Sequence, residues 1–358
     1  MLQPQQPHLF GLTHSNRDFT VKDTWGKNQF NSSFPASLCC FLHSIGERAN
    51  YLAIQGGTFG CDEISLTQAF NLDPLSDEAY FAFESLHSPY QPYVIGPLPR
   101  ADLVIQKRSS GECLRGLEVK LTALPDNTTC RLEDGSYGSE IVVRPDTIVY
   151  LACSLAKGLG AQLADFMDSA IAIEDWTDAR CVLPFVPNVI ASLKRLAMGA
   201  EPCQSPFLLQ PIWKTLGKSP RLANNCLDVF FWSDAGFAYF ITEIANDDPQ
   251  ASKITRQTRT AIWLYKMLLD ISVSGRFDPA AIIDRLSYNT KNDKAFASSG
   301  TITNRFMSSA RLTTPKIKKS QIKEIILGGG QDLLSPERRF DAIIYNSPEL
   351  FDLESFGL

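Results

Sequence analysis

Two short apolar segments joined by a tight turn constrain this chain more than any other feature of its sequence. Residues 101–108 have the pattern of a strand, residues 109–112 have the composition of a turn, and residues 114–121 have the pattern of a returning strand. Asp102 lies near the start of the first segment and Glu118 near the end of the second. Pairing of the two strands therefore brings two carboxylates together at one edge of a sheet.

A lysine completes this group of polar residues. Glu118-Val119-Lys120 is the one place in the chain where an acidic residue stands two positions before a lysine. Since strand side chains alternate, Glu118 and Lys120 are expected on one face, with Leu117 and Val119 facing a core. An alternative is a surface hairpin carrying an ordinary cross-strand ion pair, which contributes about 0.2–1 kcal/mol.

Paired carboxylates favour a hard divalent cation such as Mg²⁺, which relieves their mutual repulsion. Such a metal activates a bound water for attack on a phosphodiester, and a lysine stabilises the additional negative charge. The histidine distribution agrees with this chemistry. The chain has four histidines and none after His87, which excludes a histidine base from most of its length.

The rest of the chain predicts helices and strands on both sides of the hairpin. Helices are expected at 36–54, 77–87, 146–172, 253–273 and 278–287, strands at 138–143 and 180–186, and a β-hairpin at 227–244. The order around the carboxylates is helix, three strands, helix, strand.

This order resembles the core of PD-(D/E)XK nucleases. The matching residues are Pro99-Arg100-Ala101-Asp102 and Glu118-Val119-Lys120. Residues 116–126 and 139–145 are similar to type II restriction endonucleases of the HindVP family. In this chain two residues separate Pro99 from Asp102, whereas the family pattern has proline and aspartate adjacent.

The resemblance implies an α/β restriction endonuclease-like fold, with a mixed sheet flanked by helices and an additional C-terminal α+β region. It also implies Mg²⁺-dependent cleavage of double-stranded DNA at GRCGYC, with Asp102 and Glu118 as metal ligands and Lys120 as the catalytic lysine. A palindromic site predicts a homodimer, and a restriction enzyme implies a cognate DNA methyltransferase as genetic partner. We expect an N-terminal arm at 1–35, the nuclease core at 36–190, and DNA-recognition and dimer contacts within 191–358.

Nucleases of this fold often add a glutamate from the first helix. Glu47 is the best match in the expected helix 36–54, although Glu47 and Arg48 also suit a solvated helix face. Glu84, Glu63 and Glu140 are weaker candidates for the same role.

A basic stretch between residues 294 and 323 predicts contact with DNA phosphates. It holds seven basic residues and no acidic one, in a chain with 39 acidic and 34 basic residues and a net charge of −5. The candidates for DNA contact are Arg305, Arg311, Lys316, Lys318 and Lys319. A solvated basic loop is the alternative.

Composition sets the remaining expectations. Nine scattered cysteines without a C-x-x-C pair favour reduced thiols in a cytoplasmic protein, and neither a secretory signal nor a membrane span is predicted. Two other functions remain open: a repair or transposition nuclease of the same fold, and a non-catalytic DNA-binding protein.

Overall fold

The computed structural model describes residues 8–18, 27–119, 141–167, 171–211, 214–216, 219–221, 229–247, 253–288 and 294–298, together with 305–306, 316–318, 321 and 324–325. The strands are β1 (Ala49–Gln55), β2 (Thr58–Ile64), β3 (Ala79–Ser85), β4 (Ala101–Lys107), β5 (Cys113–Val119), β6 (Ile141–Val143), β7 (Pro206–Pro211), β8 (Lys214–Leu216), β9 (Ser219–Arg221), β10 (Val229–Ser233) and β11 (Phe296–Ser298).

The α-helices are α1 (Lys27–Ser44), α2 (Leu66–Phe70), α3 (Pro145–Leu159), α4 (Leu163–Phe166), α5 (Ala179–Val182), α6 (Val186–Gly199), α7 (Asp234–Asn246), α8 (Arg256–Ser274) and α9 (Pro279–Arg285). Short 3-10 helices are η2 (Ser88–Tyr93), η4 (Gly160–Gln162), η5 (Leu183–Phe185) and η6 (Glu201–Cys203).

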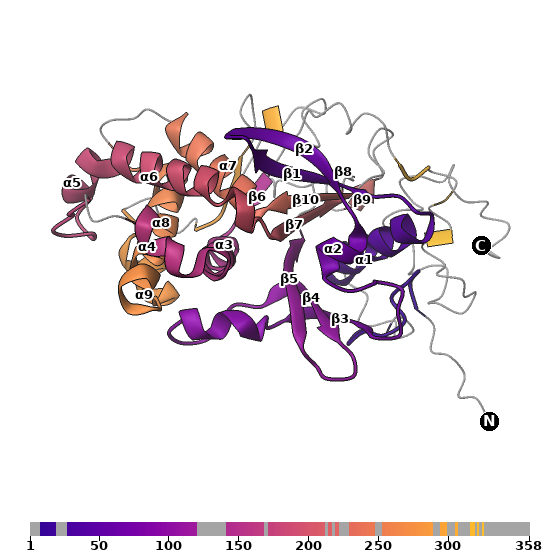
Figure 1. Ribbon diagram of the computed structural model, residues 1–358. Helices are drawn as coiled ribbons and strands as arrows, with labels where there is room; N and C mark the ends of the chain where they lie inside the picture. Colours follow the sequence, from indigo (N-terminus) through magenta and orange to yellow (C-terminus); the bar gives the residue numbers. More distant parts are fainter. Residues whose placement is uncertain are drawn as a thin grey trace.

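A mixed sheet of seven strands organises the molecule, in the order β2-β1-β10-β7-β5-β4-β3. The pairs β1–β10 and β5–β7 are parallel, and the other neighbours are antiparallel. Helices α1 and α2 lie on one side of the sheet, and α3 with α6–α9 lies on the other (Figure 1). The fold is thus mixed α/β with flanking helices, as in restriction endonuclease-like proteins.

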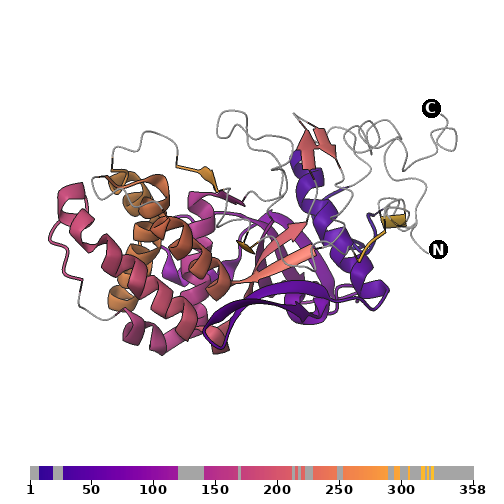
Figure 2. The ribbon, with the colours of Figure 1, turned by 90° about the horizontal axis from the view of Figure 1, so that it is seen from above.

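The sheet separates two hydrophobic cores, because its strands bury side chains on both faces. Phe83, Leu103 and Leu117 belong to the core beneath α1 and α2. Val104 and Leu208 belong to the core beneath α3, α7 and α8. The view from above in Figure 2 places the sheet between these two groups of helices.

Strands from both sides of residue 190 form this one sheet. β7 and β10 follow residue 190 in the chain and lie between β5 and β1. Helix α1 begins at Lys27, inside the segment expected to be an arm. The assignment of the nuclease core to residues 36–190, and of DNA recognition and dimer contacts to 191–358, stays a prediction.

The first expected helix ends earlier than predicted and is followed by a strand. α1 stops at Ser44, and β1 begins at Ala49, within the segment 36–54 that the sequence pattern predicts to be helical. Gly46 adopts a φ of 75°, a left-handed conformation that favours glycine. The amide of Glu47 donates to Leu42 O and that of Gly46 to His43 O, which closes the helix end with the paired bonds of a Schellman motif.

Two further predictions were wrong about element type. Residues 77–87 were expected to be a helix, but they contain β3, whose Phe81 pairs with Ile105 of β4. Residues 180–186 were expected to be a strand, but they form α5, η5 and the start of α6. Asp178 starts α5 by accepting a hydrogen bond from Arg180 N at 2.9 Å, which is N-cap chemistry.

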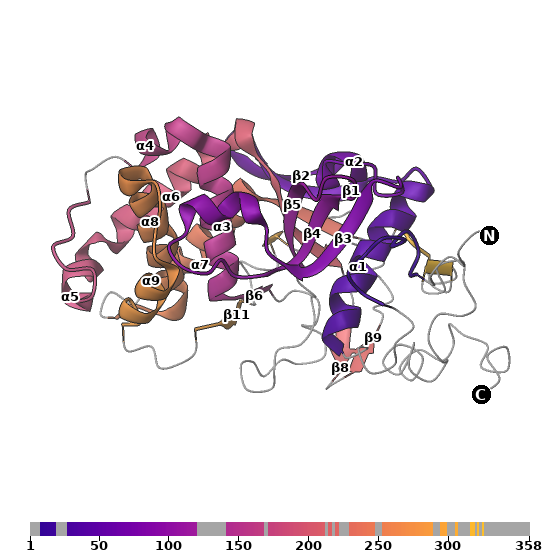
Figure 3. The same ribbon diagram turned by 90° about the horizontal axis from the view of Figure 1, so that it is seen from below.

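The expected hairpin at 227–244 is instead a strand followed by a helix. β10 ends at Ser233, whose Oγ accepts a hydrogen bond from Gly236 N at 2.7 Å and caps α7. The Ser-Asp-Ala-Gly sequence that suggested a turn is therefore a helix start. The predicted strand 138–143 corresponds to β6, which pairs with β11 in a separate small sheet (Figure 3).

Strands β4 and β5 and helices α8 and α9 confirm the corresponding predictions. The helix expected at 146–172 is confirmed in its first part by α3, which ends at Leu159 and is followed by η4 and α4. Two helical stretches, Pro145–Phe166 and Ala179–Gly199, reach the length and apolar composition of a membrane span. The first is 67% buried inside the molecule, as a core helix is. The second is 28% buried and packs Leu193 and Leu196 into the core.

Candidate active site

The hairpin of β4 and β5 brings Asp102 and Glu118 together. Leu103 pairs with Leu117, so Asp102 and Glu118 occupy the next opposed positions of the two strands. Asp102 Oδ2 also accepts a hydrogen bond from the amide of Val119 at 2.8 Å. This bond ties the Asp102 carboxylate to the residue next to Glu118.

Glu118 is buried beneath helix α3. Its exposed fraction is 7%, and its Oε1 accepts a hydrogen bond from Thr147 Oγ1 at 3.1 Å. Thr147 stands in the first turn of α3, just after Pro145, which starts the helix with a suitable fixed φ. The polar face expected for Glu118 is therefore covered by a helix, and Thr147 holds the carboxylate.

A third acidic residue, Glu84, lies on β3, and we call Glu118, Asp102 and Glu84 the carboxylate row. Phe83 pairs with Leu103 and Ser85 with Ala101, which places Glu84 opposite Asp102. Glu84 has a φ of 48°, in the left-handed region that non-glycine residues rarely occupy. Such conformations cluster at functional sites.

Arg17 supplies a cation to this row from the N-terminal segment. Its Nη2 lies 3.5 Å from Glu84 Oε1, and Nη1 donates to Ser32 Oγ at 2.8 Å and Ser33 Oγ at 2.6 Å. Burial lowers the pKa of Arg17 to about 10, and the carboxylates of Glu84 and Asp102 oppose that shift. Both carboxylates are therefore close enough to act on the guanidinium.

The neighbouring residue Asn16 fixes the position of the Arg17 backbone. The Asn16 side chain donates to Phe83 O at 2.9 Å and accepts from Phe83 N at 2.8 Å, which fixes this segment against the edge of β3. The Arg17 guanidinium lies 4.4 Å from the centre of the Phe83 ring. Sequence reasoning missed Arg17, because no local pattern links residue 17 to a strand more than sixty positions later.

The donor set of Asp102 and Glu118 fits a magnesium ion. Mg²⁺ is bound through one or two carboxylates, with waters and substrate phosphate oxygens completing its coordination. In the part of the chain that the structure describes, no group of three or more His, Cys, Asp or Glu side chains is placed to hold a metal. A site built on Asp102 and Glu118 has the one or two carboxylates that Mg²⁺ needs and leaves coordination positions for water and substrate.

Other predicted site residues lie elsewhere or are not described. Lys120 and Glu140 lie outside the described residues, although Lys120 directly follows Val119 in the sequence. Glu47 is exposed in the turn before β1. β1 is three strands away from β5, or about 14 Å at ordinary strand spacing, so Glu47 is not brought beside the pair. Glu63 lies on the outer strand β2.

The basic candidates are only partly described, and two of them form ion pairs within the protein. Arg305 pairs with Glu243, which also receives Lys194 Nζ at 2.9 Å. Lys316 Nζ lies 3.0 Å from Glu63 Oε1 and also donates to Arg48 O. Lys318 is exposed, whereas Arg311 and Lys319 lie outside the described residues.

A mixed sheet flanked by helices, with opposed carboxylates at the end of an antiparallel hairpin, defines a restriction endonuclease-like protein. The comparisons identify the family. The model of the HindVP restriction endonuclease family matches residues 25–351. The chain belongs to this family.

Two curated relatives match almost the whole chain. A probable type II restriction enzyme HindVP from Haemophilus influenzae is 56% identical over 348 residues, covering 97% of this chain and 95% of the relative. The type II restriction enzyme HgiDI from Herpetosiphon aurantiacus is 45% identical over 354 residues, covering 98% of both chains. No solved structure matches the chain.

Proposed function

We propose that this protein is a type II restriction endonuclease that cleaves both strands of DNA at GRCGYC, with Mg²⁺ as its cofactor. The observation that carries the proposal is the opposed pair of Asp102 and Glu118, fixed by Val119 N and Thr147 Oγ1. Membership of the HindVP family and full-length similarity to two type II restriction enzymes support the class of reaction.

In this mechanism the residues of the chain hold the reacting groups in place. Asp102 and Glu118 would hold Mg²⁺, which would supply a water of lowered pKa and offset the negative charge of the phosphodiester. Asp102 and Glu118 keep fixed positions because their hydrogen-bond donors belong to a strand and to the first turn of a helix. We assign Lys120 the task of donating to the attacking water and to the phosphoryl oxygens that gain charge.

The carboxylate row also affects binding of the substrate. Without a divalent cation, Asp102 and Glu118 repel a DNA phosphate placed between them. Arg17 offsets part of this charge through Glu84 and Asp102. Tight binding of cognate DNA is therefore expected to need a divalent ion, and Ca²⁺ can be used where cleavage is to be avoided.

We further propose that the region after residue 190 carries DNA recognition and dimer contacts. We assign contacts with DNA phosphate oxygens to Lys318, Arg311 and Lys319. Arg305 and Lys316 would also contact DNA after leaving their present partners, Glu243 and Glu63. A homodimer matches a palindromic site, since each protomer then cuts one strand. A cytoplasmic location and a cognate methyltransferase that protects host DNA complete the proposal.

Sequencing the ends of plasmid fragments tests this function. The purified protein, incubated with a plasmid of known sequence and Mg²⁺, is expected to give discrete fragments whose ends all fall at GRCGYC, and no cutting in EDTA. Ends at one different sequence would refute the site but keep the class. A smear of random ends would favour a nuclease of another role, and tight binding without hydrolysis would favour a non-catalytic DNA-binding protein.

A further inference from the structure

A polar pocket lies on β5, away from the carboxylate row. β5 and β7 pair at Glu118–Leu208 and Val119–Leu209, and no register pairs follow toward Arg115 and Ser205. A cavity of about 330 Å³ opens there, at the lower end of the size range of ligand pockets. Its lining residues come from η2, β5, the second half of α3 and the segment before β7: His87, Tyr90, Leu114, Arg115, Gly116, Ser154, Lys157, Gly158, Pro202, Cys203, Gln204, Ser205 and Pro206.

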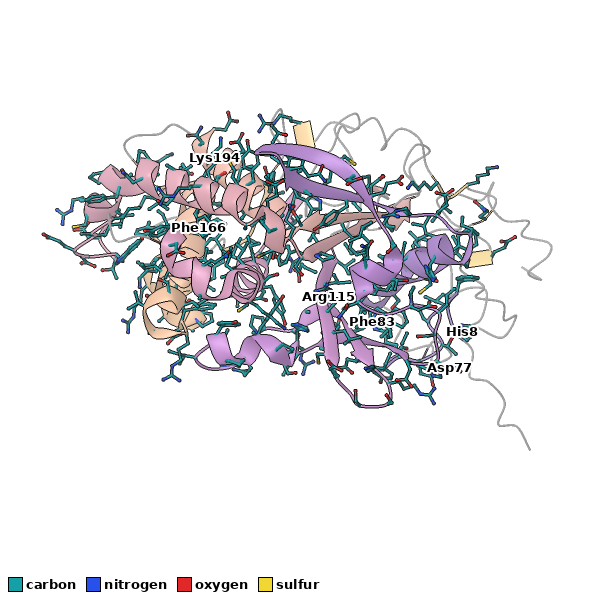
Figure 4. All side chains as sticks on the ribbon, viewed as in Figure 1. His8, Asp77, Phe83, Arg115, Phe166 and Lys194 are labelled. Atoms are coloured by element: carbon teal, nitrogen blue, oxygen red, sulfur yellow. The ribbon has the colours of Figure 1, made fainter. Side chains whose placement is uncertain are left out.

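Two cations line this pocket, which we call the cation pocket. Arg115, labelled on β5 in Figure 4, donates from Nη1 to Ser205 Oγ at 3.2 Å, and its buried Nε has no hydrogen-bond partner in the structure. Lys157 is exposed on α3, with Nζ 6.0 Å from the centre of the Tyr90 ring. Among the described residues, neither Arg115 nor Lys157 has an acidic side chain within ion-pair distance.

A buried histidine adds a third polar group to the pocket. His87 is 2% exposed, and its Nδ1 forms no hydrogen bond in the structure. Gly116 permits this position, because a Cβ on residue 116 would lie 2.9 Å from His87 Cβ. Burial, together with the positive charges of Lys157 and Arg115, lowers the pKa of His87 to about 4. His87 is therefore neutral near pH 7 and has a ring nitrogen to offer to a ligand.

One carboxylate lies beneath the pocket, but its oxygens are already used. Asp234 Oδ1 accepts from Ser205 N at 3.1 Å and Ala235 N at 2.8 Å, and Oδ2 accepts from Ser154 Oγ at 3.1 Å. Burial raises the pKa of Asp234 to about 6, so its negative charge is lost as the pH falls below 6. The cations of the pocket are thus only partly compensated from within the protein.

We propose that the cation pocket binds a phosphate group, held by Arg115, Lys157 and His87. An arginine, a lysine and an imidazole supply several donors to one tetrahedral oxyanion, and an arginine Nε left dry and unpaired is costly unless a ligand accepts from it. The pocket lies about 10 Å along β5 from Glu118, and Lys157 is about 15 Å along α3 from Thr147. It is therefore separate from the carboxylate pair and does not depend on the proposed cleavage reaction.

Thermal unfolding and calorimetry with inorganic phosphate in EDTA test this site, with chloride at equal ionic strength as the reference. Phosphate is expected to raise the melting temperature of the wild-type protein, because a ligand that binds the folded state stabilises it. Lys157→Gln, at an exposed position, should weaken phosphate binding about tenfold, the loss of one charge-assisted hydrogen bond. Arg115→Gln should weaken it at least as much.

The matched control is Lys107→Gln, which removes an exposed lysine that pairs with Glu112 at 3.8 Å on the β4–β5 turn. This variant should bind phosphate as the wild type does. The proposal is wrong if phosphate gives no stabilisation beyond chloride, or if Lys157→Gln binds phosphate as tightly as Lys107→Gln. Because Lys157 is exposed, its variant decides the matter even if Arg115→Gln does not fold.

A second arm identifies the source of the phosphate. Phosphate affinity is measured again in EDTA with the Asp102→Asn variant, which repels DNA less, and a saturating duplex that contains GRCGYC. Loss of phosphate binding, together with weaker duplex binding by Lys157→Gln, assigns the pocket to the DNA backbone. Unchanged phosphate binding assigns it to a small phosphorylated compound.

Discussion

The two ends of β5 carry opposite chemistry on one strand and beneath one helix. At one end Glu118 lies opposite Asp102, and Thr147 in the first turn of α3 holds it. At the other end Arg115 and Lys157 line a pocket beside the second half of α3. The difference comes from the neighbouring strands. β7 pairs with β5 at Glu118, whereas it no longer pairs beside Arg115 and leaves a cavity there. The second carboxylate at the Glu118 end, Asp102, comes from β4.

This comparison predicts that the two ends respond differently to substitution. Changes at the carboxylate end should affect cleavage, and changes at the cation pocket should affect ligand binding and the pH dependence of stability.

Removing either carboxylate of the pair should nearly abolish cleavage. Asp102→Asn or Glu118→Gln should lower the cleavage rate by about 1000-fold, since several kcal/mol of transition-state stabilisation depend on the metal site. Single-turnover cleavage of a cognate duplex measures the effect. Glu112→Gln, at the exposed turn of the same hairpin, should cleave normally; equal losses in all three variants would mean that the hairpin is only scaffold.

Arg17 should stabilise the carboxylate end. Arg17→Ala removes a largely buried guanidinium that contacts Glu84, Ser32 and Ser33, and we expect the free energy of unfolding to fall by about 2 kcal/mol. Urea denaturation measures this change. Arg108→Ala, which removes an exposed arginine that donates to Asp77 O, is the control; a similar loss there would argue against a special role for Arg17.

Acid should destabilise the protein through His87. Its folded-state pKa of about 4 lies below the usual 6.5, so the unfolded chain binds the proton more readily and stability falls as the pH drops from 6.5 toward 4. Asp234, with a pKa raised to about 6, acts in the opposite direction over an overlapping range. His87→Asn should therefore retain about 1–2 kcal/mol more of its neutral-pH stability at pH 5 than the wild type does. Identical pH profiles in urea titrations would contradict this account of His87.

The smallest effect is expected from Thr147, which positions Glu118. Thr147→Val keeps the shape of the side chain but removes the donor to Glu118 Oε1, which costs about 1 kcal/mol and slows cleavage about tenfold. Thr147→Ser, which keeps the hydroxyl, should restore most of the rate. A valine variant as fast as the serine variant would show that the hydroxyl does not position Glu118.

The two ends of β5 also differ in how far the sequence could predict them. Asp102 and Glu118 are separated by one hairpin, so alternation and turn composition were enough to place them on opposed strands. The cation pocket combines Arg115 with Lys157 and Ser205, and their proximity depends on α3 and β7 returning to β5. No local pattern contains that information. The same is true of Arg17 beside Glu84.

Wrong predictions arose where a short pattern has two meanings. Ser233 and Gly236 suited a hairpin turn, but the same serine caps α7 when apolar residues follow at helical spacing. Phe81 and Phe83 sit two apart in β3, although the surrounding sequence suggested a helix. Basic residues after 294 predicted a DNA surface from charge, yet Arg305 and Lys316 have acidic partners that lie far away in the sequence. Residue content predicts charge, while the tertiary fold decides whether that charge is paired.

Divalent-ion binding tests the central claim most directly, because the account depends on Asp102 and Glu118 acting as one metal site. Calorimetry with Ca²⁺ and a cognate duplex should give saturable ion binding to the wild-type complex and no detectable binding at the same site in the Asp102→Asn, Glu118→Gln double variant. Equal ion binding by both proteins, with both still bound to DNA, would contradict the assignment of this pair as the metal site.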